Sequence, residues 1–219
     1  NDSHYRLCKE ALKVARETEA DLFVTPEYSF PMELIGEMLT NSDLQPPHGK
    51  LWCLACQGEG RARFEDYLGT WEQHACVIRP LRGYYHHRDF VCALIYVFMS
   101  QDDNTLCIVP QLKLHSSADP EFYCEGDALS RGTAVYTFGS DRPNQLCSII
   151  CADAFHPDMH AGLFFPNHNE NWIILHPQLN KRPRHPSMVR LRDAIFSRTE
   201  GRHVVYITAN WAESTEVNL

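Results

Sequence analysis

Two features of the 219-residue sequence predict an α/β fold in which layered sheets are covered by helices. Apolar runs of strand length mix with segments of helical periodicity, and some strands adjoin each other with no helix between them. That order differs from the regular alternation of a simple parallel sheet. Because no repeat, low-complexity stretch or shift of composition divides the chain, we expect residues 1–219 to form one domain.

The individual elements follow from local patterns. Helical spacing of apolar residues predicts helices over 3–19, 61–74 and 188–201, the last of them ended by Gly201. The turn-like residues 101–104 separate two apolar runs and predict a β-hairpin. Loops are expected over 40–50 and 115–132, and strands are expected over 21–27, 51–57, 90–99, 105–114, 133–139, 145–153, 171–178 and 203–212. The first helical pattern starts close to Asn1 with no preceding methionine, so we expect the natural chain to extend further at this end.

Charge and cysteine content narrow the classes of protein. The formal net charge of −8 argues against nucleic acid as a partner, and the basic run Lys181–Arg192 is read as a solvated face. The nine cysteines are odd in number and several lie in apolar runs, which is typical of free thiols in a reducing compartment. No signal peptide or membrane-length apolar run is visible. We therefore expect a cytoplasmic protein without a disulfide framework and without a membrane segment.

Three apolar strands end in a side chain that could take part in a reaction. DLFVTPE ends at Glu27, IVPQLKL carries Lys113, and LCSIICAD ends at Cys151 and Asp153. A thiol attacks carbon as its thiolate, so a nearby carboxylate that takes the proton would activate it. An ammonium can stabilise the negative charge that then develops. Taken singly, each residue has a plainer interpretation: a buried cysteine, a solvated or capping carboxylate, and an edge lysine that discourages aggregation.

The order and context of these segments resemble the nitrilase, or carbon–nitrogen hydrolase, superfamily. ADLFVTPEYSF resembles its first signature, with Glu27 as general base, and QLKLHSSADPEFY resembles its lysine segment. Glu121, eight residues after Lys113, matches the second glutamate that often follows the lysine. CSIICADAFHPD resembles the nucleophile segment, with Cys151 followed by Asp153, Pro157 and Asp158. The resemblance spans about residues 10–212, and it departs from the usual pattern at Ala152 and His156, where aromatic residues are more common.

The resemblance implies a fold, a reaction and a set of partners. The fold would be a four-layer α-β-β-α sandwich, and the catalytic residues would be Glu27, Lys113, Cys151 and Glu121. The reaction would be hydrolysis of a non-peptide carbon–nitrogen bond of the amide, nitrile or carbamoyl type, through a cysteine thioester. It needs no cofactor and no metal. Expected partners are a small amide or nitrile substrate and further copies of the chain in a homo-oligomer.

Other readings of the sequence stay open. A zinc site could use Cys53 and Cys56 together with some of the twelve histidines, such as His86 and His87, but a second paired motif is absent and the two cysteines would not share a strand face. A catalytically silent nitrilase-like domain could serve as a scaffold or oligomerisation unit of a larger, defence-associated protein. Glutamine-dependent amide transfer would need an ammonia-consuming partner domain. A papain-like protease lacks a matching histidine context.

Overall fold

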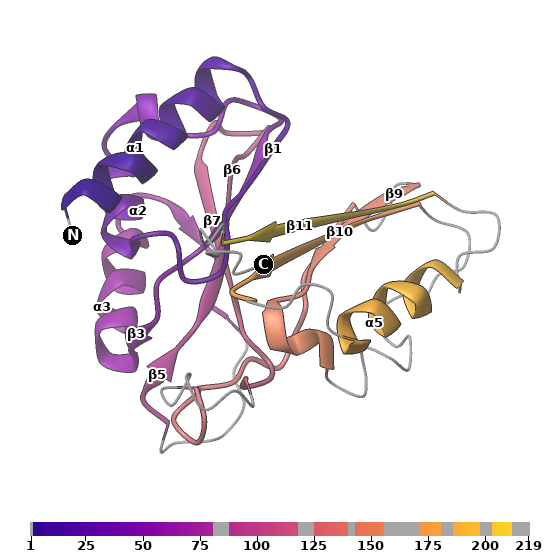
Figure 1. The fold of residues 1–219 in the computed structure, drawn as a ribbon. Coiled ribbons are helices and arrows are strands. Elements are labelled where there is room, and N and C mark those ends of the chain that lie inside the picture. The colour runs from indigo at the N-terminus through magenta and orange to yellow at the C-terminus, as the bar shows by residue number, and fades with distance from the viewer. Residues whose placement is uncertain are drawn as a thin grey trace.

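The computed structural model describes residues 2–80, 88–117, 125–139, 143–155, 171–180, 186–197 and 203–211, which form a mixed α/β structure (Figure 1). The helices in these ranges are α1 (Asp2–Glu17), α2 (Met32–Met38), α3 (Arg61–Trp71) and α5 (Pro186–Ser197), with short 3₁₀ turns η1 (Ser42–Leu44) and η3 (Cys151–Phe155). None of the helices in the described ranges is long and apolar enough to cross a membrane.

One sheet has five strands in the order β1-β2-β6-β7-β4. Its strands are β1 (Leu22–Val24), β2 (Leu51–Ala55), β6 (Ala93–Met99), β7 (Leu106–Leu112) and β4 (Cys76–Val77). The predicted hairpin is confirmed, because β6 and β7 pair antiparallel from Ala93 opposite Leu112 to Met99 opposite Leu106. β1 pairs parallel with β2 and forms one edge of the sheet.

The other large sheet has the order β11-β10-β9-β8. Its strands are β11 (Val204–Asn210), β10 (Asn171–Gln178), β9 (Asn144–Ser148) and β8 (Thr137–Phe138), and β10 runs parallel to both of its neighbours. A small two-stranded sheet joins β3 (Glu59–Gly60) to β5 (Phe90–Val91). The apolar run expected as one strand over 90–99 is therefore divided at Cys92, because its two halves pair with different strands.

The alternation of side chains along each strand explains the packing. In β2, Trp52 and Leu54 pack in a cluster with α1, α2 and α3, whereas Cys53 and Ala55 pack in a second cluster. That second cluster also contains Leu175 of β10, so it receives side chains from both large sheets. A third cluster joins one face of β9 and β10 to α5. In Figure 1, α1–α3 and α5 accordingly lie on opposite sides of the sheets.

A buried amide links the two large sheets near the C-terminal ends of β7 and β9. Gln111 of β7 donates from Nε2 to the carbonyl oxygen of Ser148 in β9 at 3.0 Å. Its Oε1 accepts from the Tyr96 hydroxyl at 3.0 Å and from the N–H of Tyr136 at 3.1 Å. Since buried polar groups are costly unless bonded, these three hydrogen bonds of Gln111 fix β7 against β9.

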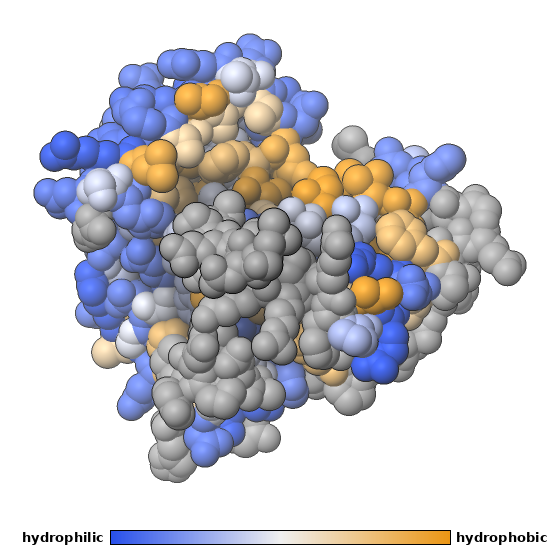
Figure 2. Space-filling model, viewed as in Figure 1, coloured by the Kyte–Doolittle hydropathy of each residue, from blue (hydrophilic) through white to orange (hydrophobic). Residues whose placement is uncertain are grey.

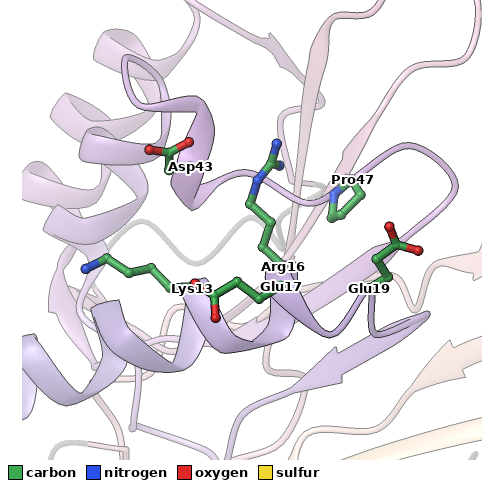
Figure 3. Close-up of a pocket in the computed structure, with 6 residues that line it drawn as sticks. All are labelled: Lys13, Arg16, Glu17, Glu19, Asp43 and Pro47. Atoms are coloured by element: carbon green, nitrogen blue, oxygen red, sulfur yellow. The ribbon is translucent and has the colours of Figure 1, made fainter.

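The molecular surface has two notable features. A band of apolar residues crosses the face drawn in Figure 2, and the large apolar side chains exposed in the described ranges include Leu7 and Val14 of α1 and Val205 of β11. A separate hollow of about 460 Å³ opens beside the C-terminal half of α1 (Figure 3). Charged side chains of both signs dominate its lining, which consists of Lys13, Arg16, Glu17, Glu19, Asp43 and Pro47.

Several predicted boundaries were wrong. β1 and β9 end three residues before Glu27 and Cys151, so Glu27 lies in the loop after β1 and Cys151 begins the 3₁₀ turn η3. α2 was not anticipated, because seven residues are too few to display a helical period. The strand expected over 133–139 is reduced to β8, and α5 starts at Pro186, before the expected residue 188. The predicted stop of this helix at Gly201 falls outside the described residues.

Candidate active site

The structure brings Glu27, Lys113 and Cys151 together at the ends of three strands. Lys113 directly follows β7, and its Nζ donates to Glu27 Oε1 at 2.7 Å. The Glu27 and Cys151 side chains lie near each other, and each influences the pKa of the other. All three are buried, and Cys151 is the most accessible at 8% exposure against 1% for Glu27 and 0% for Lys113. Their proximity in space meets one geometric condition for a joint chemical role.

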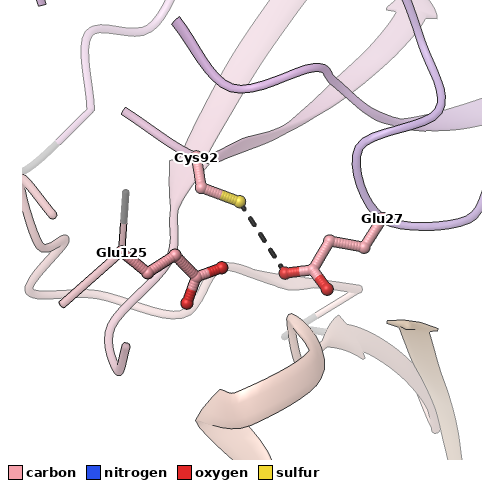
Figure 4. A group of neighbouring side chains, drawn as sticks. All are labelled: Glu27, Cys92 and Glu125. Carbon is pink, nitrogen blue, oxygen red and sulfur yellow. Dashed lines mark hydrogen bonds between the residues drawn. The ribbon is translucent and has the colours of Figure 1, made fainter. Parts of the chain in front are cut away.

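Glu27 is held by groups from widely separated parts of the chain. Its Oε2 accepts the N–H of Leu179 at 3.1 Å, and its main-chain oxygen accepts from Trp211 Nε1 at 2.7 Å. The Cys92 thiol donates to Oε1 at 3.8 Å (Figure 4). Burial raises the pKa of Glu27 above its ordinary value, although the Lys113 charge acts in the opposite direction. The carboxylate is therefore a stronger base than it would be in water.

Lys113 lies between two carboxylates. Its Nζ donates to Glu125 Oε1 at 2.5 Å in addition to Glu27. Burial alone would lower the pKa of Lys113, but the negative charges around it, Glu27 foremost, outweigh burial and raise that pKa well above its usual range. The side chain is therefore a fixed positive charge at any physiological pH.

Glu125 is a site residue that the sequence reasoning missed. Its Oε1 also accepts from the Tyr28 hydroxyl, and its Oε2 accepts the N–H of Ser117 at 2.6 Å. The predicted second glutamate, Glu121, lies outside the described residues. Both acids belong to the expected loop over 115–132, and no local pattern distinguishes them. Spacing from Lys113 was the only signal, and a long loop does not fix spacing.

The backbone around Lys113 is packed tightly. Its N–H donates to the carbonyl of Cys92 at 3.0 Å, and its carbonyl accepts the N–H of Gly132 at 2.9 Å. A Cβ at Gly132 would lie 2.5 Å from the Leu112 carbonyl oxygen, so only glycine allows this approach. The lysine is thus positioned by main-chain contacts on both sides as well as by its side-chain partners.

Cys151 occupies a backbone conformation that is rare for its type. Its φ of 39° lies in the left-handed region, at the first residue of η3. Burial, followed by the Glu27 charge, raises the pKa of the thiol well above its usual range, against opposing effects of the Lys113 charge and the Leu179 N–H. The resting group is therefore a protonated thiol next to a carboxylate that can receive its proton.

Asp153 connects the turn that begins at Cys151 to the segment after Lys113. Its Oδ1 accepts the N–H groups of Leu114 at 2.8 Å and His115 at 2.7 Å, while Oδ2 has no hydrogen-bond partner among the described residues. Burial raises the pKa of Asp153 to about 7. His156, Pro157 and Asp158, which the sequence resemblance also singled out, lie outside the described residues.

One group of side chains has ligand atoms close enough to hold a metal ion. Donor atoms of Glu27, Cys92 and Glu125 all lie within 4.8 Å of one another (Figure 4). The Lys113 ammonium, however, already bonds both carboxylates, and a second cation there would be repelled. This donor set fits an ammonium better than a metal.

The zinc reading of the sequence finds little support in the geometry. Cys53 and Cys56 contribute to different core clusters, and His86 and His87 fall outside the described residues. All eight cysteines within the described ranges are free.

None of the protein-family models matches the chain, and no curated protein sequence is significantly similar to it.

Proposed function

We propose that this chain is a nitrilase-type carbon–nitrogen hydrolase that cleaves a small amide, nitrile or carbamoyl compound through a thioester on Cys151. The packing of helices and sheets in three core clusters is compatible with the four-layer α-β-β-α sandwich of that family, and we propose this architecture. The observation that carries the proposal is the buried charge cluster: a lysine bonded to two glutamates, with a thiol beside one of them. The second glutamate of the proposed site is Glu125, whose hydrogen bond to Lys113 the sequence did not reveal.

The protonation states fit the first chemical step. The thiol of Cys151 passes its proton to Glu27 as Sγ forms a bond to the substrate carbon. Negative charge then develops on the substrate oxygen or nitrogen. An ammonium has three N–H donors, and two of those on Lys113 bond the glutamates. The third, together with the N–H of Ala152, would stabilise the developing charge.

The second half of the cycle reuses the same base. For an amide, the proton on Glu27 passes to the leaving nitrogen as the carbon–nitrogen bond breaks, which releases ammonia or an amine and leaves the thioester. Glu27 next removes a proton from water, and the resulting hydroxide attacks the thioester carbon. The carboxylic acid leaves and the proton returns to Cys151. Glu125 keeps the ammonium of Lys113 in place throughout. Because these side chains supply the nucleophile, the base and the charge stabilisation, the proposed reaction needs no cofactor.

Ammonia release and selective labelling test the proposal together. Purified protein is incubated with a panel of small aliphatic and aromatic amides and nitriles, and ammonia is measured for the wild type, Cys151→Ala and Cys76→Ala. Cys76 is an exposed thiol outside the site and serves as the matched control. We expect the wild type and the control Cys76→Ala to hydrolyse at least one substrate. Cys151→Ala should hydrolyse none. Iodoacetamide should also label Cys151 in the wild type faster than the buried thiols Cys53 and Cys147.

A silent scaffold would give a different pattern. Ammonia release would be absent with every substrate, and Cys151 would label no faster than other buried thiols. That result would leave the runner-up function, an oligomerisation or scaffold domain of a larger protein, as the better account. The apolar band in Figure 2 is compatible with either outcome, because large exposed apolar patches commonly mark contact surfaces.

We further propose that the protein works as a homo-oligomer in the cytoplasm. The exposed side chains of Leu7, Val14 and Val205 supply apolar surface for such a contact. Light scattering coupled to size-exclusion chromatography measures the molar mass in solution, and a value equal to one chain of 25.2 kDa would contradict the oligomer.

A further inference from the structure

The backbone of the proposed nucleophile needs outside support. Cys151 has a φ of 39°, a conformation that residues with a Cβ adopt only when surrounding contacts impose it. One such contact acts on its carbonyl oxygen, which lies 3.0 Å from Nε2 of His176 in β10. This histidine is fully buried and plays no part in the mechanism above. Its surroundings therefore call for an explanation.

The hydrogen bonds of His176 define its tautomer. A carbonyl oxygen can only accept, so Nε2 carries the proton. Nδ1 accordingly accepts, from Gln178 Nε2 at 2.8 Å and from the Tyr206 hydroxyl. Burial lowers the pKa of His176 to about 4, so the ring stays neutral at physiological pH. The network joins the neighbouring strands β10 and β11 and presents one N–H to the nucleophile turn.

Anchoring that carbonyl also orients the next N–H. The carbonyl of Cys151 and the N–H of Ala152 belong to one planar peptide unit and point in opposite directions. A hydrogen bond to the oxygen therefore fixes the direction of the N–H and polarises it as a donor. In the mechanism proposed above, this N–H shares the charge that develops on the substrate.

We infer that His176 is a positioning residue for the oxyanion donor: its Nε2–H holds the Cys151 carbonyl so that the Ala152 N–H points at the reacting oxygen. The inference rests on the proposed function, since it assigns a role within that site. Gln178 and Tyr206 keep the ring in the required tautomer. The inference predicts that loss of the Nε2 donor slows reactions that pass through an oxyanion more than reactions of the thiol that do not.

Two probes separate these reactions. With p-nitrophenyl acetate, Sγ of Cys151 bonds the acetyl carbon through an oxyanion, p-nitrophenolate leaves and Glu27 takes the thiol proton. With iodoacetamide, Sγ displaces iodide and no oxyanion forms. The second-order rate constant of each is followed at Cys151 by peptide mass spectrometry. The ratio of acetylation to alkylation then reports the oxyanion donor and cancels changes in thiol access.

A matched pair of variants tests the role of Nε2. In His176→Gln the amide nitrogen can occupy the place of Nε2, whereas in His176→Asn the shorter amide reaches only the place of Nδ1. We expect the ratio to stay within about threefold of the wild type in His176→Gln and to fall at least about tenfold in His176→Asn, since outright loss of an oxyanion donor costs about 10²–10³-fold. An unchanged ratio in His176→Asn overturns the inference.

Two further outcomes are distinguishable. If His176→Asn does not fold, Tyr206→Phe removes one hydrogen bond from Nδ1 and should lower the ratio at least twofold; an unchanged ratio there also overturns the inference. If the wild type shows no preference for Cys151 with either probe, the proposed function itself fails. If Cys151 is reactive but the ratio of acetylation to alkylation is unchanged in all three variants, the proposed function is retained. In that case only the role inferred for His176 is overturned.

Discussion

The ionisation of Asp153 connects the chemistry of this site to the pH dependence of the stability of the fold. Burial raises its pKa from an ordinary 3.8 to about 7, because the charged carboxylate would have an oxygen without a partner among the described residues. The folded state therefore prefers the protonated acid. Between these two pKa values the unfolded chain loses the proton while the folded chain retains it, so the contribution of Asp153 to stability falls as pH rises from about 4 to about 7.

The size of the effect follows from the same values. Each tenfold change in proton affinity is worth about 1.4 kcal/mol, so the full penalty at pH 8 is about 4 kcal/mol. At pH 5 only about 1.5 kcal/mol of it has developed. Asp153→Asn removes the ionisation and keeps an oxygen for the N–H groups of Leu114 and His115. The free energy of unfolding of the variant, relative to the wild type, should therefore rise by about 2.5 kcal/mol between pH 5 and pH 8.

Urea denaturation followed by tryptophan fluorescence measures this difference at pH 5, 6, 7 and 8. Asp103→Asn is the control, because Asp103 is exposed and hydrogen bonds from Ser100 and Thr105 lower its pKa, which is the opposite direction. The control should show no gain in relative stability at pH 8. If the curves of Asp153→Asn and the wild type stay parallel from pH 5 to pH 8, Asp153 does not ionise in a buried site and the reasoning fails.

Three other changes test the core of the site. Lys113→Met leaves two buried carboxylates without their cation and should lower the free energy of unfolding by about 3–5 kcal/mol at pH 8. The control, Lys13→Met, removes only an exposed ion pair and should leave the free energy of unfolding unchanged. Urea denaturation measures both. Glu27→Gln removes the base and should slow ammonia release about 10²–10⁴-fold, and retained turnover would exclude that role. Gly132→Ala places a Cβ 2.5 Å from a carbonyl oxygen of β7 and should destabilise the fold by about 1–3 kcal/mol. The control, Gly36→Ala in an open position of α2, should stabilise the fold by about 0.5–1 kcal/mol, and thermal melting curves measure both changes.

The sequence predicted those parts of the fold that depend on local periodicity. α1 and α3 were anticipated because apolar residues recur at helical spacing, and β10 was predicted with its observed bounds, Asn171–Gln178. The hairpin of β6 and β7 followed from a turn between two apolar runs. Where pairing partners decide the structure, local pattern was insufficient. The break at Cys92 arises because β5 pairs with β3 while β6 pairs with β2, and neither partner is encoded nearby in the chain.

The site was predictable to the same extent. Glu27, Lys113 and Cys151 each follow an apolar run, and a strand end is a local feature. Glu125 and His176 were not found, because their roles arise from contacts across 12 and 25 positions of sequence that only the folded chain creates. His176 lies inside the mostly buried strand β10. A histidine in such a strand is more often a hydrogen-bonded core residue than a member of a reactive site.

The buried charges are difficult to explain by stability alone. A lysine and two glutamates without exposure to water lose their hydration, and apolar residues of similar volume are often neutral or stabilising by about 1–4 kcal/mol in such positions. Apart from Gln111, β7 consists of apolar residues up to Leu112, so a further apolar side chain would have suited the next position. A lysine at this point is instead bonded by two acids, with a protonated thiol beside one of them and a strained turn that carries the thiol. The buried charges and the left-handed backbone at Cys151 each cost folding free energy. Strongly perturbed ionisable groups cluster at functional sites, so the combination supports the proposed catalytic role.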